Sequence, residues 1–140
     1  MSIVYRHDAT LTPEDYAGLL NRTSLGARRP VGDLNAVTQM LKHADILITA
    51  WDGPKLVGVA RSFTDRAYVT YLADLAVDEA YQKRGIGKQL IAETAKQTQP
   101  TCKLVLFAAP DAAAYYGRVG LEAMTNGWGL AAGTLPPGTT

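Results

Sequence analysis

Cysteine, net charge and long apolar runs are all scarce in this sequence, and each scarcity excludes a class of protein. Cys102 is the only cysteine, so an internal disulfide is excluded and a reducing, cytoplasmic compartment is favoured. No apolar run approaches the roughly 18 residues of a membrane-spanning helix, and the opening MSIVYRHD lacks the apolar core of a signal peptide. The 14 basic and 13 acidic side chains give a net charge of +1, which argues against a general nucleic-acid or membrane-surface binder.

What the chain does have is enough apolar residues for one folded domain. Its 140 residues are 47% hydrophobic, which suits a single compact core. We expect that domain to span 1–133. The glycine- and proline-rich end, 134–140, has no apolar periodicity and is expected to form a flexible tail.

The first half of the chain is predicted to alternate strands and helices. Thr12 before Pro13 is typical of a helix start, because the hydroxyl caps the helix and proline needs no hydrogen bond there. Asp33 predicts a second capped start, before apolar residues at helical spacing. The expected elements are strands over 3–6, 45–51 and 56–63, helices over 12–21 and 33–44, and a loop over 25–32 between the helices.

The second half contains the one segment whose composition changes sharply. After a predicted strand over 68–77, the sequence QKRGIGK is basic and rich in glycine, and it opens an amphipathic helix. A buried strand over 103–108 and a short helix over 111–119 follow, and the remainder is expected to add one or two closing strands. The fold class is therefore a mixed α/β (α+β) domain with the order β-α-α-β-β-β-α-β-α-β-(β).

The segment QKRGIGK has the properties of a phosphate site. The first amides of a helix have no partner inside it and lie at the positive end of its dipole. Glycine allows an anion to approach the backbone closely, and Lys83, Arg84 and Lys88 add positive charge. Neither the P-loop pattern nor the GxGxxG fingerprint of dinucleotide sites is present.

Two segments resemble the GNAT superfamily of N-acyltransferases. The family's acyl-CoA motif has Gln or Arg, then Gly three residues later and Gly or Ala two residues after that, and Gln82, Gly85 and Gly87 match it. A later segment, AAAYYGRVGL, is similar to the family pattern with an aromatic pair and a glycine, and it aligns Tyr115 and Tyr116. The order and the spacing of both segments also match, over nearly the whole chain.

The resemblance implies a mixed, mostly antiparallel sheet that binds acetyl-CoA as co-substrate without a metal. In the family, the strand before the motif separates from its neighbour at a bulge, and its free backbone groups bind the pantetheine arm. The residues that the resemblance implies for acetyl-CoA are Leu75, Ala76, Val77, Gln82, Lys83, Arg84, Gly85, Ile86, Gly87 and Lys88.

The resemblance also implies a direct attack of a neutral amine on the thioester. A backbone N–H near Leu75 would stabilise the oxyanion, and Tyr116 matches the family tyrosine that protonates the departing thiolate. Asp74 is a candidate general base, acting directly or through water; alternatively it holds a hydrogen-bond network together.

The acceptor is less defined by the sequence. Arg22, Arg28 and Arg29 lie in the loop that borders the acceptor pocket in this family. They suggest an acceptor with an acidic group, a contact to the adenosine phosphate of CoA, or a solvated basic loop. A small-molecule amine is the expected acceptor; the alternatives are a protein, a peptide or an aminoacyl-tRNA, or a non-catalytic acyl-CoA-binding module. Trp51 and Trp128 are candidates for a pocket or core, and the strand expected around Trp128 is a possible homodimer contact.

Overall fold

The computed structural model describes residues 2–134 and 138 of the chain. By their contacts these residues form two compact units, 1–107 and 108–140. The predicted tail, 134–140, lies outside the described residues except for Thr134 and Gly138.

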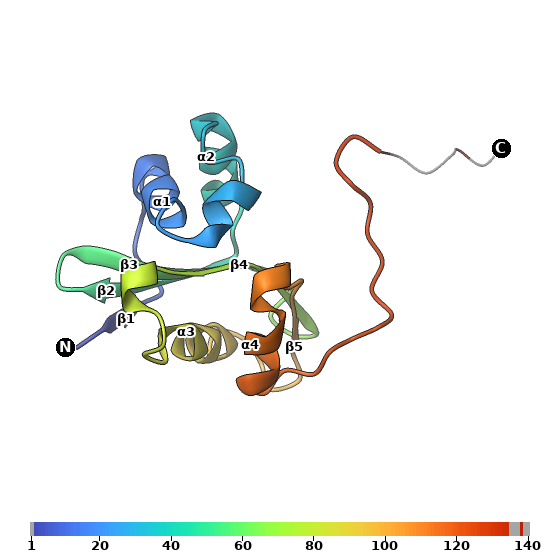
Figure 1. The fold of residues 1–140 in the computed structure, drawn as a ribbon. Helices are drawn as coiled ribbons and strands as arrows, with labels where there is room; N and C mark the ends of the chain where they lie inside the picture. Colours follow the sequence, from blue (N-terminus) through green and yellow to red (C-terminus); the bar gives the residue numbers. More distant parts are fainter. Residues whose placement is uncertain (1, 135–137, 139–140) are drawn as a thin grey trace. The chain divides into compact units, whose positions relative to one another are not determined.

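The first unit is built on a five-stranded sheet whose strands follow one another in chain order (Figure 1). The first four strands pair antiparallel and only β4 and β5 run parallel, so the sheet is mixed, as expected. The strands are β1 (Val4–Arg6), β2 (Ile46–Asp52), β3 (Lys55–Thr64), β4 (Val69–Val77) and β5 (Lys103–Val105).

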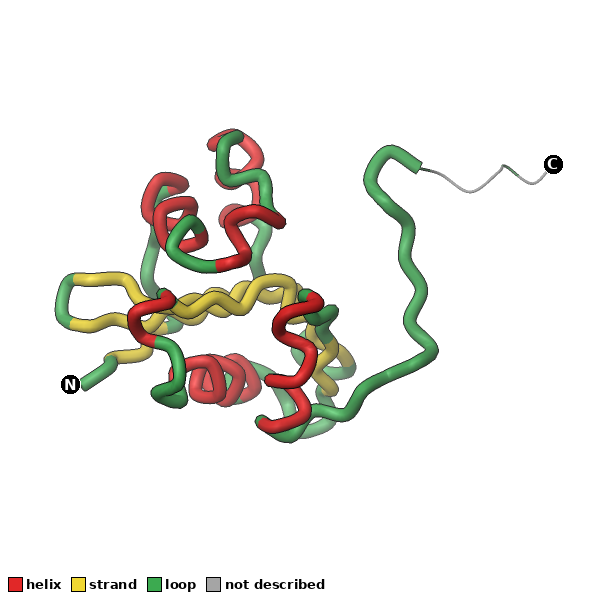
Figure 2. The backbone as a smooth tube through the Cα atoms, viewed as in Figure 1, coloured by secondary structure: helices red, strands yellow, loops and turns green. Residues whose placement is uncertain are grey.

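Helices cover both faces of this sheet. Figures 1 and 2 show α1 (Pro13–Leu20) and α2 (Leu34–Lys42) over one face and α3 (Ile86–Ala95) over the other. On the first face Leu19, Leu20 and Val37 pack against apolar side chains of β3 and β4. On the second face Ile86 and Leu90 pack against β2 and β3. The two cores hold β4 between them, and β4 carries the predicted site.

The helix starts are confirmed, together with their physical cause. The Thr12 hydroxyl accepts a hydrogen bond from the Asp15 amide at 3.1 Å, with Pro13 in the first helical position. The Asp33 carboxylate accepts from the Ala36 amide at 3.1 Å. The expected loop over 25–32 is partly ordered as a 3-10 helix, Ser24–Arg28, because Thr23 caps it in the same way.

A β-bulge on β4 changes which face its side chains occupy. Arg61 of β3 pairs with Asp74, but the next residue of β3 pairs with Leu72, so Ala73 is an extra residue. Strict alternation would place Leu72 and Asp74 on one face. Instead Leu72 packs in the core beneath α3, while Asp74 bonds to Tyr16 of α1. The bulge therefore places Asp74 on the α1 face of the sheet, directly before Leu75.

The second unit contains a 3-10 helix, Pro110–Ala112, followed by α4 (Ala113–Arg118). Gly120, with φ of +102°, ends that helix as expected. The prediction of one or two closing strands is wrong for the described residues, because none of 119–134 is in a strand. Their glycines and exposed apolar side chains have no strand partner among the residues that the structure describes.

Candidate active site

The edge of β4 that faces β5 is paired over only three of its nine residues. β5 meets β4 at Val69–Tyr71 and no further, so from Leu72 to Val77 this edge has no strand partner among the described residues. The Asp78 amide bonds to the Val57 carbonyl on β3. By the alternation of an antiparallel ladder, the backbone groups of Leu75 and Val77 then point away from β3, toward the open edge.

This geometry separates the three residues that were predicted to bind the pantetheine arm. Leu75 and Val77 present backbone groups to the open edge, and the Val77 carbonyl accepts a bond from Gln82 Nε2 at 3.1 Å. Ala76 pairs with Val59 of β3 and is 3% exposed, packed beneath α1 and α2. Its backbone is therefore engaged within the sheet, and Ala76 supports the edge without facing it.

The loop after β4 leads into α3, and the first backbone amides of that helix have no partner within it. Lys83 and Gly85 both have positive φ, +64° and +80°, which turns successive amides toward one side. Gly85 is the N-cap and provides no side-chain cap. The first bond inside the helix runs from the Gln89 amide to the Gly85 carbonyl, so the amides before Gln89 have no partner within α3.

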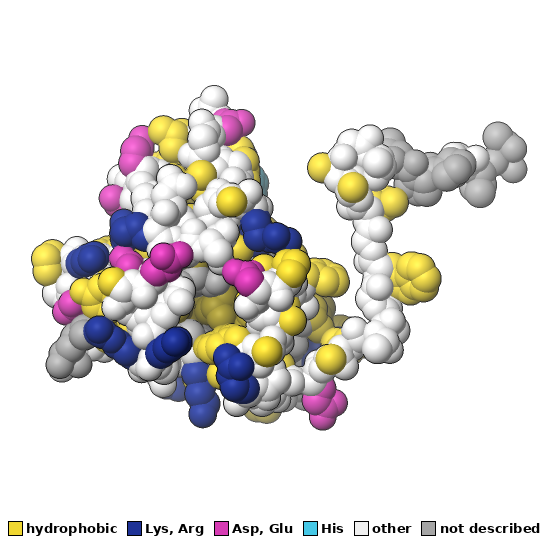
Figure 3. Space-filling view, viewed as in Figure 1, with side chains coloured by type: hydrophobic (Ala, Val, Ile, Leu, Met, Phe, Trp, Pro, Cys, Tyr) yellow, Lys and Arg dark blue, Asp and Glu magenta, His cyan; other side chains and the backbone are white. Residues whose placement is uncertain are grey.

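Positive charge surrounds that helix start. Figure 3 shows Lys and Arg side chains gathered over the segment that leads into α3. Lys83, Arg84 and Lys88 are all exposed, and the Arg84 guanidinium lies 5.2 Å from the centre of the Tyr81 ring. Free amides, the helix dipole and lysine and arginine side chains together form a site for a phosphate or pyrophosphate.

Asp74 lies at the centre of a buried polar cluster. Its side chain is fully buried and receives bonds from three donors: Tyr16 Oη at 2.5 Å, Arg61 Nε at 2.7 Å and Arg29 Nε at 2.6 Å. Arg29 also donates to the Ala73 carbonyl at 2.9 Å, which fixes the bulge. This is the second of the two roles expected for Asp74, that of holding a hydrogen-bond network together.

Within the cluster, the pKa of Asp74 is lowered and the pKa of Tyr16 is raised, so the carboxylate stays charged and the phenol stays neutral. Burial raises the pKa of Asp74, but hydrogen bonds and charge from Arg61, with the bonds from Tyr16 and Arg29, outweigh it and hold the pKa below 3.8. Burial and the neighbouring Asp74 raise the pKa of Tyr16 well above 10.0. A carboxylate with a lowered pKa and three donors is a weak proton acceptor.

Two of the three loop arginines also have structural partners. Arg22 donates to Asp78 at 2.7 Å and to the Leu56 carbonyl at 2.7 Å, which ties α1 to the sheet. Arg29 binds Asp74, as above, and Arg28 is exposed to solvent. The sequence analysis missed Arg61 and Tyr16 as partners of Asp74. Arg61 did carry a signal, because a charged residue within an apolar strand is buried only when it is paired.

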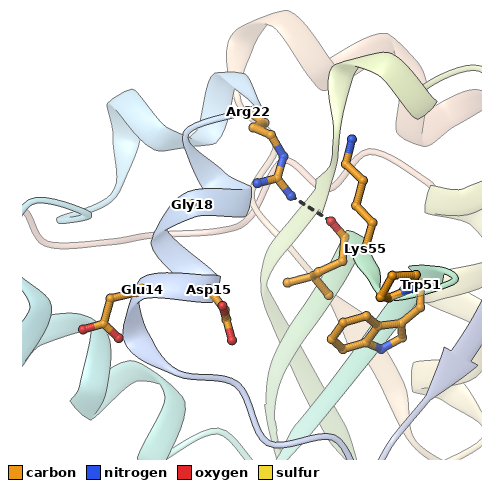
Figure 4. Close-up of a pocket in the computed structure, with 8 residues that line it drawn as sticks. Glu14, Asp15, Gly18, Arg22, Trp51 and Lys55 are labelled. Carbon is orange, nitrogen blue, oxygen red and sulfur yellow. Dashed lines mark hydrogen bonds between the residues drawn. The ribbon is translucent and has the colours of Figure 1, made fainter.

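A pocket of about 390 Å³ opens beside Arg22, between α1 and the hairpin of β2 and β3 (Figure 4). Trp51 forms one wall, as the sequence suggested, and its indole N–H donates to Thr49 at 2.8 Å. The other lining residues are Glu14, Asp15, Gly18, Pro54, Lys55 and Leu56. The pocket borders the end of β4, because Arg22 and Lys55, which line it, both pair with Asp78, the residue after β4.

The last catalytic candidate, Tyr116, lies in the second unit. It is partly buried on α4, and its ring makes an edge contact with Tyr115 at 5.3 Å between centroids. The other candidates are all in the first unit, on β4, the glycine loop and the start of α3. Within the described part of the chain, no group of three potential metal ligands is found, and no helix has the length and apolarity to cross a membrane.

Comparison with known proteins identifies relatives of this arrangement. A family model described as an acetyltransferase (GNAT) domain matches residues 27–128. An N-acetyltransferase of Porphyra purpurea is 29% identical over 93 residues, covering 62% of this chain and 53% of that protein. A protein named histone acetyltransferase from Glycine max is 32% identical over 75 residues, covering 52% of this chain and 32% of that protein. The chain thus spans about half or less of these relatives' length.

Solved structures share the fold over nearly the whole chain. A GNAT-family acetyltransferase from Streptococcus pneumoniae has a TM-score of 0.71 at 22% identity, covering 94% of this chain and 99% of that one. A protein named AAC(6')-Iy, solved with a bisubstrate analogue that contains CoA, has a TM-score of 0.69 at 18% identity, covering 94% of this chain and 98% of that one. The mixed sheet, the open edge of β4 and the glycine loop thus agree with the family match: the chain belongs to the GNAT acetyltransferase family.

Proposed function

We propose that this chain transfers an acetyl group from acetyl-CoA to the primary amine of a small molecule. One observation carries the proposal: the unpaired edge of β4 runs directly into a glycine loop and the free amides of α3. An extended, amide-containing arm that ends in a pyrophosphate matches both halves of this surface. Leu75 and Val77 would pair with the arm, and the amides from Arg84 to Lys88 would bind the pyrophosphate.

The same residues account for the chemistry of transfer. The amine lone pair attacks the thioester carbonyl, and the Leu75 N–H at the open edge donates to the oxygen as it becomes negative. The C–S bond then breaks, the thiolate takes a proton from Tyr116, and the amine releases its own proton to water. We assign Asp74 a positioning role, because its oxygens are occupied by Tyr16, Arg29 and Arg61.

The relatives support a small-molecule acceptor more than a macromolecular one. Two structural neighbours are named aminoglycoside acetyltransferases, with TM-scores of 0.69 and 0.61. The soybean relative named a histone acetyltransferase favours the alternative of a protein or peptide amine. The net charge of +1 disfavours an aminoacyl-tRNA, since binding RNA normally takes an excess of basic residues. The single Cys102 leads us to infer a reducing, cytoplasmic location.

Thiol release from acetyl-CoA, measured over a panel of amines, polyamines, amino acids and peptides, tests the proposal. We expect turnover with one acceptor class, and Tyr116→Phe should lower kcat about 100-fold with little change in the KM for acetyl-CoA. Tyr115→Phe is the matched control, because it removes the neighbouring hydroxyl from the same helix and should keep kcat. Tight CoA binding without turnover on any amine would instead indicate the non-catalytic acyl-CoA-binding module.

A further inference from the structure

A row of aromatic side chains lies on β3, on β4 and just after β5, next to the buried Asp74 cluster. The rings of Phe63 and Tyr71 stack with centroids 6.4 Å apart, and Phe107 meets Tyr71 edge-on at 5.8 Å. Tyr71 is 37% exposed and Phe107 is 70% exposed, so the row faces solvent without a protein cover in the described first unit. These three residues are called the aromatic row below.

The aromatic row is joined to a buried guanidinium. Arg61 is only 6% exposed, and its guanidinium lies 5.3 Å from the centre of the Phe63 ring. Among the described residues its Nε bonds to Asp74 Oδ2, and the Tyr16 hydroxyl lies close enough to influence it. Apart from Asp74 and Tyr16, its N–H donors have no protein acceptor among the described residues, and none of its nitrogens is both buried and unsatisfied. These donors are therefore open to an acceptor from solvent or from a ligand.

The charge balance of the cluster also favours an anion. Two guanidinium groups, Arg29 and Arg61, are paired with one carboxylate, Asp74, and both pairs are shorter than 2.8 Å. Acidic side chains other than Asp74 make no ion pair with either arginine in the described part of the chain. A carboxylate on the ligand would balance the second guanidinium and would accept the free donors of Arg61.

The chemistry of the acceptor nitrogen points the same way. No free carboxylate is present at Asp74 to remove a proton, so the acceptor amine must lose its proton easily by itself. In a free α-amino acid, the neighbouring carboxylate holds the ammonium proton by its negative charge. When arginine neutralises that carboxylate, the ammonium is acidified and the reactive neutral amine becomes more abundant.

We propose that the acceptor is an α-amino acid with an aromatic or large apolar side chain. Its carboxylate binds at Arg61, its side chain lies against the aromatic row, and its α-amine faces the open edge of β4 at Leu75. This inference rests on the proposed acetyl transfer and names the substrate class of that site.

A series of acceptors that differ by one group tests each contact. We expect kcat/KM for phenylalanine to exceed that for phenylalaninamide and phenethylamine, which lack the carboxylate, by about 10- to 100-fold. It should exceed that for alanine, which lacks the ring, by about tenfold. Comparable kcat/KM values across the series, or a preference for spermidine or an aminoglycoside, would overturn the inference.

Variants of the aromatic row provide a second readout. Tyr71→Ala should raise the KM for phenylalanine about tenfold and leave the KM for alanine unchanged. Tyr68→Ala is the matched control, because Tyr68 is 63% exposed on the same edge but stacks with Lys103, outside the row. Arg61→Lys keeps the buried charge with fewer donors and should reduce the advantage of phenylalanine over its amide. Should both Tyr71→Ala and Tyr68→Ala change the KM equally, the row is not the binding surface.

Calorimetric titration with CoA separates this inference from the proposed function. If CoA fails to bind, the acetyl-transfer proposal fails and this inference fails with it. If CoA binds and a different class of amine is acetylated, only the assignment of the acceptor fails. If CoA binds and no amine is acetylated, the acetyl-transfer proposal fails as well.

Discussion

At the scale of single residues, the Asp74 carboxylate makes the free energy of unfolding depend on pH in the acid range. Burial raises its pKa, but the bonds from Arg61, Tyr16 and Arg29 outweigh burial and hold the pKa below 3.8. Such a group stabilises the fold fully above its unfolded pKa, and that stabilisation is lost as pH falls through the folded pKa. Asp74→Asn should therefore cost about 3–5 kcal/mol near neutral pH, and the difference from wild type should shrink below pH 3.8.

Urea denaturation of both proteins across that pH range measures the effect. Asp65→Asn is a useful control, because Asp65 is an exposed carboxylate whose partners are backbone amides. The Asp65→Asn change leaves the guanidinium groups of Arg29 and Arg61 paired with Asp74. A difference between wild type and Asp74→Asn that stays constant down to acid pH would show that the carboxylate is not the stabilising group.

The sequence predicted part of this cluster and not the rest. Asp74 was identified from its place before the glycine motif, and Arg29 from its loop. Tyr16 and Arg61 lie 58 and 13 residues away from Asp74 along the chain, and only the packing of α1 on the sheet brings them together. A buried ion pair is fixed by tertiary contacts, so local pattern identifies a charged residue in a strand without identifying its partners.

At the scale of elements, the backbone geometry of the glycine loop predicts how a substitution at Gly85 changes stability and CoA affinity. Gly85 has φ of +80°, and a Cβ there would meet no atom within 4 Å. Gly85→Ala should therefore cost about 1 kcal/mol by backbone strain alone. Because the loop can relax only by turning its amides, we expect CoA affinity to fall on the order of tenfold, measured by calorimetry.

The hairpin turn provides a control with the same strain at another place. Gly53 has φ of +55° and equally open surroundings, and it joins β2 to β3 away from the glycine loop. Gly53→Ala should lower the unfolding free energy by a similar amount and keep CoA affinity. Equal losses of affinity in both variants would mean that general destabilisation, and not the loop amides, explains the result.

Elements were predicted well where a local signal defines them. Caps and proline located α1 and α2, and β-rich apolar runs bounded by turn residues located the strands of the sheet. The strand expected over 103–108 is shorter, Lys103–Val105, and it pairs with β4 only at Val69–Tyr71. The position of the bulge at Ala73 and the lack of a closing strand depend on partners elsewhere, which local sequence does not encode.

At the scale of the whole molecule, the two units are expected to divide the work. Both apolar core clusters lie entirely within 1–107, as do the open edge, the glycine loop and the Asp74 cluster. The second unit contributes Tyr116 and has no fully buried residue in its described helices. Trp128, also in the second unit, is 94% exposed. It remains the candidate for the homodimer contact that the sequence suggested.

Truncation tests that division. We propose that residues 1–107 fold cooperatively and bind CoA within about threefold of the full chain, a change below 1 kcal/mol, because every contact proposed for CoA is retained. Acetyl transfer should be lost, since Tyr116 is absent. The matched piece, 1–133, removes only the predicted tail and should keep full activity, which thiol release from acetyl-CoA measures. If 1–107 unfolds while 1–133 does not, the second unit completes the core; if 1–107 still turns over at the wild-type rate, Tyr116 is not the acid that protonates the thiolate.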